Sequence, residues 1–303
     1  MEAGLHVTLY SLLKNYSRKS TGLKIYLFLD GFSDRDISLL RATLDNAGTS
    51  YELHLRSIDL DSFDGFYSLF GSSMPYARIM LADILKDENK FLYLDSDLLV
   101  DVDVHDLFHT DLQNELLGAV VGGTIEWSLE KEFFLAHQFQ KDDPYFNSGV
   151  LLFNAARWRD EKLMEECFAL CKKYPDQLKC QDQTVLNYIC NKKVLALDKC
   201  YNVHSYASGN SNRGEPSGCQ ITHFLGSPKP WDIFGSILHP GYPRFKIYFA
   251  QTALNGKIRV QPQSFYRAFK LRRSYFRCIL AKYKRELGHL IKFKPRTPRQ
   301  LPP

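Results

Sequence analysis

Two aspartates interrupt a run of apolar residues at positions 91–100, which reads FLYLDSDLLV. Asp95 ends the apolar part and Asp97 follows two residues later, so both side chains point the same way if the backbone stays extended. Carboxylate oxygens are the ligands that Mn²⁺ and Mg²⁺ prefer, and a cation held there would bind a diphosphate in turn. The alternative is a strand end at which the aspartates only cap the following turn. The pattern alone leaves both interpretations open.

Two further stretches place amides, a hydroxyl and a carboxylate where elements begin. In PYFNSGVLLFN, Asn147 and Ser148 come just before a buried run, where they either contact a sugar or form the turn into the strand. In QDQTVLNYI, Gln181, Asp182 and Gln183 begin an amphipathic helix, and Asp182 is also a suitable N-cap. Both stretches are therefore candidates for sugar binding with an ordinary structural alternative.

The stretch HFLGSPKPW at 223–231 combines a histidine, a glycine and a lysine. His223 follows a strand-like run and could complete a metal site, although a single histidine is more often an ordinary, partly buried side chain. Gly226 permits close approach of the backbone to a phosphate, and Lys229 carries a charge that neutralises one. Together they suit a diphosphate.

These residues need a scaffold, and strand-like runs alternate with helical patterns along the chain. The expected strands are 24–30, 51–58, 91–95, 116–121, 150–154, 194–198 and 219–225, and the expected helices are 5–19, 34–47, 76–87, 161–174 and 182–190. This alternation predicts an α/β fold with a mixed, mostly parallel, buried sheet flanked by helices. Ligands bind such sheets beyond the carboxyl ends of the strands, which is where Asp95 lies.

Composition narrows the class of protein. The chain has 303 residues, of which 45% are hydrophobic, as expected of a folded protein with a sizeable core. Its seven cysteines are scattered without a CxxC pair, which favours a reducing compartment over a disulfide framework. No window approaches the roughly 18 consecutive apolar residues of a membrane span. We therefore expect a cytoplasmic protein.

The net charge of +5 conceals a basic tail. Residues 264–303 contain twelve Lys or Arg and one acid, which is +11, so residues 1–263 carry 5 − 11 = −6. The apolar residues Phe265, Phe269, Phe276, Leu280, Tyr283, Leu287 and Ile291 recur at helical spacing, with Arg267, Lys270, Arg273, Arg277, Lys284 and Arg285 largely between them. We expect a globular domain at 1–263 and a basic amphipathic helix that lies on an anionic membrane. The alternative is a helix whose apolar face packs on that domain. Nucleic acid is not expected as a partner, because the rest of the chain is acidic.

One segment is expected to move. Residues 203–218, VHSYASGNSNRGEPSG, contain much Ser, Gly and Asn and little apolar surface to bury. We predict a lid that orders over bound nucleotide-sugar. The alternative is a passive surface loop.

In their order and spacing, the four motifs resemble the family 8 glycosyltransferases, which are retaining enzymes with the GT-A fold. The closest likeness is to bacterial lipo-oligosaccharide α-galactosyl- and α-glucosyltransferases, and it extends from about residue 3 to residue 290. The resemblance implies a UDP-hexose donor (galactose or glucose), Mn²⁺ or else Mg²⁺, and a saccharide or lipid-linked acceptor at the inner face of the membrane.

The resemblance also implies roles for individual residues. Asp95 and Asp97, with Ser96 between them, match the motif that binds Mn²⁺ and the donor, and His223 matches the third protein ligand. Gly226 and Lys229 match positions that contact the diphosphate. Donor-sugar contacts are matched by Arg78, Asn147, Ser148 and Asp182, and Gln183 matches a residue near the reacting carbon.

The chain departs from the family pattern in two places. The first strand of the family and its uridine-covering loop should precede residue 3, so we expect an unpaired strand edge. After the run at 116–121 the family often has an acidic residue, where this chain has Gly122 and Gly123. The alternative function is therefore a truncated, inactive sugar-nucleotide binder or scaffold.

The expected mechanism follows from the charges that develop in the reaction. Negative charge grows on the leaving diphosphate and positive charge on the sugar, and the metal site with Lys229 would stabilise the former. Retaining glycosidases use a carboxylate nucleophile, yet no clear one is present here. We therefore expect attack by the acceptor on the same face of the sugar, with Gln183 supporting the reacting carbon.

Overall fold

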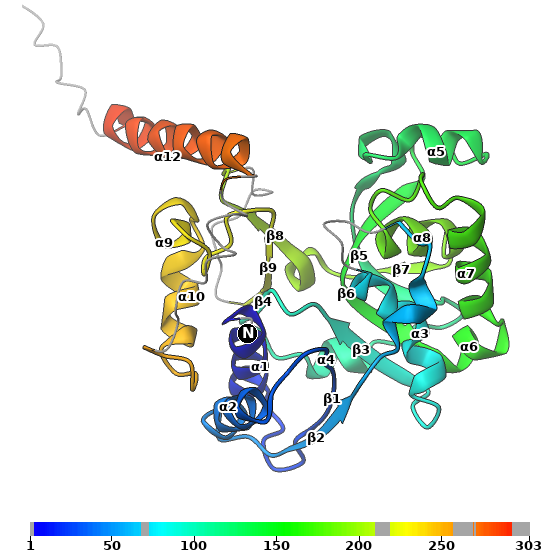
Figure 1. Ribbon diagram of the computed structural model, residues 1–303, viewed down its shortest axis with the longest axis horizontal. Helices are drawn as coiled ribbons and strands as arrows, with labels where there is room; N and C mark the ends of the chain where they lie inside the picture. The colour runs from blue at the N-terminus through cyan, green and yellow to red at the C-terminus, as the bar shows by residue number, and fades with distance from the viewer. Residues whose placement is uncertain (1–2, 68–72, 210–218, 257–268, 270, 293–303) are drawn as a thin grey trace, which may run out of the picture.

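The computed structural model describes residues 3–67, 73–209, 219–256, 269 and 271–292, with the backbone alone for 285–292. Figure 1 shows strands through the middle of the molecule, most helices packed around them, and the long helix α12 at one end. The strands are β1 (Leu23–Phe28), β2 (Tyr51–Arg56), β3 (Lys90–Leu94), β4 (Leu98–Val100), β5 (Leu117–Thr124), β6 (Pro144–Asn154), β7 (Val194–Ala196), β8 (Val203–Tyr206) and β9 (Ile221–Leu225). The α-helices are α1 (Ala3–Asn15), α2 (Asp34–Asp45), α3 (Ala77–Ile84), α4 (His105–His109), α5 (Lys131–Ala136), α6 (Ala155–Asp160), α7 (Leu163–Lys173), α8 (Asp182–Ile189), α9 (Gly235–Leu238), α10 (Tyr242–Phe249) and α12 (Arg272–Lys292). Short 3-10 helices are η1 (Leu60–Phe63), η2 (Met74–Tyr76), η3 (Ile125–Trp127) and η4 (Lys199–Asn202).

The strands form three sheets. Their orders are β1-β2, β3-β6-β5-β7 and β4-β9-β8. The pairs β1-β2, β5-β7 and β8-β9 are parallel, whereas β3-β6, β5-β6 and β4-β9 are antiparallel. The expected mixed α/β architecture is therefore present, but among the described strands parallel pairs do not outnumber antiparallel ones. Strand β6 runs antiparallel to both of its neighbours, β3 and β5, which the alternating pattern did not reveal.

Most expected elements are present, and two strands were missed. Strand β4 has three residues, too few for a periodicity to show. Strand β8 occupies Val203–Tyr206, the beginning of the segment predicted to be a lid, and it pairs with β9. That part of the lid prediction is wrong, because the backbone of β8 is held in a sheet. Residues 210–218 of that segment lie outside the described residues, as do the expected boundary at 263 and the tail residues Phe265, Arg267 and Lys270.

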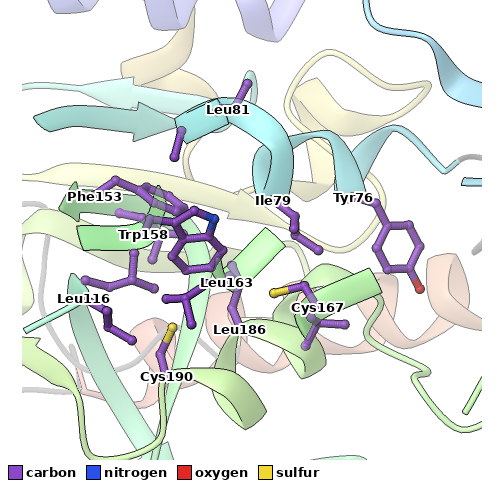
Figure 2. Close-up of a cluster of buried hydrophobic side chains, with 14 of the residues drawn as sticks. Tyr76, Ile79, Leu81, Leu116, Phe153, Trp158, Leu163, Cys167, Leu186 and Cys190 are labelled. Atoms are coloured by element: carbon purple, nitrogen blue, oxygen red, sulfur yellow. The ribbon is translucent and has the colours of Figure 1, made fainter. Parts of the chain in front are cut away.

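The largest apolar cluster lies between the four-stranded sheet and helices α3, α6, α7 and α8. Figure 2 shows Trp158 of α6 in this cluster, close to Phe153 of β6. The two rings meet edge to face with centroids 5.4 Å apart, and Phe153 stacks on Phe91 of β3 at 4.7 Å. Full burial of a side chain of this kind contributes about 1.5–3 kcal/mol. The packing fixes β3 against β6 and thereby positions the polar residues at their ends.

Helix α1 covers the outer edge of β4. Leu98 N donates to Thr8 Oγ1 at 3.0 Å, Thr8 Oγ1 donates to Leu98 O at 2.8 Å, and Val100 N donates to Ser11 Oγ at 3.0 Å. These hydroxyls satisfy strand groups that would otherwise be buried without partners. The N-terminal turn of α1 reaches the aspartate motif, because a Cβ on Gly4 would lie 2.7 Å from the carbonyl oxygen of Ser96.

A cavity of about 840 Å³ lies between β1 and β3. Its lining takes consecutive residues from both strands, 23–30 and 90–97. Because successive strand residues face opposite sides, a lining of this kind runs along strand edges rather than across one face. Within the described part of the chain β1 pairs only with β2 and β3 only with β6. The edges of β1 and β3 that line this cavity therefore have no strand partner among the described residues.

Candidate functional site

Three potential metal ligands converge where β3, β4 and β9 meet. Asp95 and Asp97 lie between the end of β3 and the start of β4, and the antiparallel pairing of β4 with β9 places His223 opposite Leu98. His223 Nε2 lies 3.1 Å from Asp97 Oδ1 and 3.6 Å from Asp95 Oδ2. One ligand atom from each residue falls within 4.8 Å of the others. Sheet pairing thus joins two motifs that are 126 residues apart, 223 − 97.

The orientation of His223 leaves a nitrogen facing the carboxylates. Asn202 donates through Nδ2 to Asn147 Oδ1 at 3.0 Å, so Asn202 Oδ1 is turned toward His223 Nδ1, 3.1 Å away. His223 Nδ1 must then be the donor, which leaves Nε2 facing Asp97 Oδ1. Asp97 Oδ1 is buried and accepts no well-directed hydrogen bond among the described residues. A divalent cation between His223 Nε2 and Asp97 Oδ1 would give both atoms a partner. A site of one nitrogen and two carboxylates suits Mn²⁺.

Glycine makes room for this arrangement. A Cβ on Gly149 would lie 2.2 Å from His223 Cε1 and 2.9 Å from Asp95 Oδ2, so no side chain fits there.

Burial raises the pKa of Asp97, but His223 and Lys229 outweigh it and hold the pKa below its usual range. The carboxylate is therefore ionised, as a metal ligand must be.

Asp95, Asp97 and His223 together are called the ligand cluster, or the cluster, below. Arg78 of α3 joins this cluster to a second group of residues. Its guanidinium is buried, with Nη2 2.9 Å from Asp95 Oδ1 and Nε 3.1 Å from Asp182 Oδ2. Nη1 donates to the carbonyl of Ser148, and the guanidinium lies over the Tyr93 ring, 4.4 Å from its centroid. Burial opposes its charge, yet Asp182 and Asp95 raise the pKa of Arg78 above its ordinary value. Arg78 therefore stays charged and holds both carboxylates in place.

The second group, which we call the α8 corner, consists of Asn147 and Ser148 of β6 with Asp182 and Gln183 of α8. Ser148 Oγ donates to Asp182 Oδ2 at 2.8 Å, and Asn147 Nδ2 donates to Gln183 Oε1 at 2.8 Å. Burial raises the pKa of Asp182 to about 6, against the opposing effect of Arg78 and Ser148. The structural alternative for Asp182 is wrong, because Gln181 is the N-cap and the Asp182 side chain points to Ser148.

The turn after β9 carries the expected diphosphate residues. Gly226 has φ +72°, a conformation that other residues rarely adopt, and it lets the chain turn back toward the cluster. Lys229 Nζ donates to Asp97 Oδ2 at 2.5 Å and to the carbonyl of Phe224. Ser96 lies exposed between the two aspartates. At the end of β5, a Cβ on Gly122 or Gly123 would meet nothing within 4 Å, so the glycines leave open space.

Several residues of the site were not expected from the sequence. Tyr93 donates to Asp95 Oδ1 at 2.7 Å, and Gln183 Nε2 donates to the Tyr145 hydroxyl at 2.9 Å. Asn202 bridges Asn147 and His223. Tyr93 and Tyr145 lie two residues before Asp95 and Asn147, a strand spacing that places them on the same face. No sequence signal marks Asn202.

The model of a known protein family, "Glycosyl transferase family 8", matches residues 3–234. Glycosyltransferase GlyA of Streptococcus pneumoniae serotype 4 is 34% identical over 173 residues, which cover 54% of this chain and 23% of that protein. The lipopolysaccharide 1,2-glucosyltransferase of Escherichia coli K12 is 27% identical over 167 residues, covering 52% of this chain and 48% of that protein. The chain thus spans about a quarter and about half of these relatives.

The crystal structure of galactosyltransferase LgtC in complex with donor and acceptor sugar analogues has a similar fold. Its TM-score is 0.69 with 24% sequence identity, over 86% of this chain and 94% of that one. A similarity at this identity shows the fold, and it confirms the expected GT-A architecture. The match of the family model, which covers most of the chain, goes further: the chain belongs to glycosyltransferase family 8.

Proposed function

We propose that the protein is a retaining glycosyltransferase that moves a hexose, galactose or glucose, from a UDP-sugar to a saccharide or lipid-linked acceptor with Mn²⁺. The observation that carries this proposal is the convergence of Asp95, Asp97 and His223 beside two cationic side chains, Arg78 and Lys229. Two carboxylates and a histidine offer a cation site, and the cations beside it suit a diphosphate. The intact cluster also argues against an inactive binder.

The three ligands would hold Mn²⁺, or Mg²⁺ in its place, and the bound ion would neutralise charge on the diphosphate. Lys229 donates to Asp97 in the free protein and would turn its ammonium to a phosphate oxygen when the donor binds. Gly226 lets the backbone approach that phosphate closely. The residues of the turn thereby stabilise the UDP leaving group.

The α8 corner would bind the donor sugar. Asp182 and Asn147 present a carboxylate and an amide, and Arg78 keeps Asp182 in one position. Because these groups already bond to one another, the corner is preorganised before the sugar arrives. Gly122 and Gly123 leave room at the end of β5, where the choice of donor hexose or acceptor would be made.

Retention would proceed by attack on the same face of the sugar. Asp182 is a poor nucleophile, because Arg78 and Ser148 both hold the same oxygen, Oδ2, and the side chain is buried. The Gln183 carbonyl oxygen would support positive charge at the reacting carbon. With neither residue suited to a covalent intermediate, the acceptor hydroxyl would enter on the side from which UDP leaves.

Helix α12 would place the enzyme on an anionic membrane. Phe276, Leu280 and Tyr283 share one face of the helix and are 61%, 47% and 59% exposed, so this apolar face does not pack on the domain. Arg272, Arg273 and Arg277 line an open pocket together with Phe276, and each basic residue near anionic lipid adds about 1 kcal/mol. No helix in the described part of the chain is long and apolar enough to span a bilayer. We propose peripheral attachment at the cytoplasmic face, where a lipid-linked acceptor is presented.

Vesicle flotation tests this attachment. The double variant Phe276→Ser, Leu280→Ser should bind phosphatidylglycerol-containing vesicles at least tenfold more weakly than the wild type at low salt. Ile247→Ser, which changes a residue of α10 that is 58% exposed, is the matched control and should bind normally. Equal binding by the double variant would exclude α12 as the attachment.

The reaction itself is tested by UDP release from a panel of UDP-hexoses with Mn²⁺, followed by NMR of the product anomer. We expect turnover with UDP-galactose or UDP-glucose and an α-linked product. No release with any UDP-hexose would support the inactive binder, and a β-linked product would refute retention.

A further inference from the structure

Helix α12 docks on the domain through a narrow face. Among the α12 side chains that the structure describes, Cys278 alone is buried, at 2% exposure. It packs in a small cluster with Ala207, which follows β8, and Leu238 of α9. Tyr275 adds a contact to Phe234, with ring centroids 6.5 Å apart. In Figure 1 α12 lies beyond α9, away from the large apolar core.

This docked face contacts the turn that carries the diphosphate residues. Ser274 Oγ donates to the carbonyl oxygen of Ser227 at 3.0 Å, and Cys278 Sγ lies 3.9 Å from the same oxygen. Ser227 follows Gly226 directly and is two residues before Lys229. The conformation of this turn therefore depends in part on a helix far along the chain.

The apolar face of α12 points away from the domain. Ser274 and Cys278 are four residues apart and share the docked face, whereas Phe276, Leu280 and Tyr283 lie on the opposite side and are exposed. A membrane can therefore bind the exposed face while the docked face stays on the turn. Docking fixes the direction of the exposed face, so a docked helix loses less freedom on binding a membrane and should bind it more tightly.

We propose that Ser274 and Cys278 are positioning residues for the diphosphate turn, so that binding of α12 to an anionic membrane strengthens donor binding. The inference rests on the proposed function. Because the docked face buries little apolar surface, the docked and undocked positions of α12 differ little in free energy. A ligand that favours the docked position, whether the membrane or UDP, therefore shifts the population toward it. By linkage, UDP with Mn²⁺ must strengthen membrane binding by the same factor as the membrane strengthens UDP binding.

The docked state can be followed through Cys278. Maleimide labelling of the full-length protein, mapped by peptide mass spectrometry, reports how often this thiol becomes accessible. Cys171 of α7 is fully buried in the main core and is the matched internal control. UDP with Mn²⁺, or phosphatidylglycerol vesicles, should each slow labelling of Cys278 at least threefold and leave Cys171 unchanged.

Ser274→Ala tests the contact itself. Loss of one hydrogen bond should weaken UDP binding with Mn²⁺ about threefold to tenfold. It should also move the effect of vesicles on UDP affinity toward a factor of one, which a general loss of stability would not do. Ser38→Ala removes a comparable bond on α2, from Ser38 Oγ to Asp34 O at 2.8 Å, and should leave both quantities unchanged.

The outcomes separate this inference from the function on which it rests. The inference is overturned, and the function left intact, if the protein binds UDP and vesicles normally but neither ligand changes the labelling of Cys278. In that case Ser274→Ala should also bind UDP as the wild type does. A protein that binds no UDP with Mn²⁺ in calorimetry refutes the function and the inference with it. Slower labelling with UDP, together with a weakened Ser274→Ala, supports both.

Discussion

The ligand cluster of Asp95, Asp97 and His223 and the α8 corner both contact Arg78, but their carboxylates differ in how many hydrogen-bond and ion-pair partners they have. In the cluster, the Asp95 and Asp97 side chains are 22% and 24% exposed, and Asp97 Oδ1 accepts no well-directed hydrogen bond from the described residues. In the corner, the Asp182 side chain is 6% exposed and bonds to both Arg78 and Ser148. The first region has oxygens to spare for a cation, whereas the second is complete without a ligand. Changes in the cluster should therefore affect ion and donor binding, and changes in the corner should affect stability as well.

The largest effect should come from Asp97→Asn. Loss of the carboxylate removes a metal ligand and the partner of Lys229, and turnover with UDP-sugar and Mn²⁺ should fall by about 10³-fold or more. The melting temperature should fall by less than in Arg78→Met, because the remaining amide oxygen can still accept from Lys229. Asp106→Asn, on a side chain that is 94% exposed, is the matched control for rate. Activity of Asp97→Asn near that of the control would break the comparison.

Arg78→Met should affect both regions. It leaves Asp182 buried without its cation, which should lower the free energy of unfolding by about 3 kcal/mol or more. Adding Asp182→Asn to Arg78→Met should restore part of that loss, because no unpaired charge remains. Arg157→Met, in a half-exposed pair with Glu161, should cost less than about 1 kcal/mol. Urea unfolding of five proteins is needed, the wild type, Arg78→Met, Asp182→Asn, the double variant and Arg157→Met, and additive effects of the two buried changes would contradict the coupling.

The cluster was the more predictable region. Asp95, Asp97 and His223 stand in short motifs whose residue types carry their own chemistry, and the resemblance to family 8 predicted that these three side chains would converge, as they do. The strand pairing that joins them, β4 with β9, was not predictable, because β4 is three residues long. Asn202 was missed because its role depends on two partners brought together only by the fold. The lid prediction failed at β8, where pairing with β9 overrides a composition typical of loops.

The corner should also show a pH dependence that the cluster does not cause. Burial raises the pKa of Asp182 from 3.8 to about 6. Between these values the folded chain keeps a proton that the unfolded chain has lost, so the free energy of unfolding falls as the pH rises from about 4 to about 6. At about 1.4 kcal/mol per pKa unit the contribution is on the order of 3 kcal/mol.

Asp182→Asn removes this titration, so the difference in stability between the wild type and this variant measures it. In metal-free buffer, urea unfolding of the wild type and of Asp182→Asn at pH 4, 5, 6 and 7 should give stabilities that converge or cross as the pH rises. Parallel pH profiles would show that Asp182 ionises normally in the folded protein.

The smallest effect should come from Gln183→Ala. Its amide accepts from Asn147 and donates to Tyr145, and both partners are neutral, so the loss of stability should be about 1 kcal/mol. Turnover should fall about tenfold while the affinity for Mn²⁺ stays unchanged, if Gln183 supports the reacting carbon. Calorimetry with Mn²⁺ and steady-state kinetics separate the two quantities. A loss of Mn²⁺ affinity would instead place Gln183 with the cluster.

The central claim is that Asp95, Asp97 and His223 form a metal site that binds the donor diphosphate. Calorimetric titration of UDP into the wild type with Mn²⁺ and with EDTA tests it most directly, with Asp97→Asn measured in parallel. The account predicts UDP binding at least 100-fold tighter with Mn²⁺ than with EDTA, and no such difference in the variant. Equal UDP affinity for the wild type in Mn²⁺ and in EDTA would contradict it.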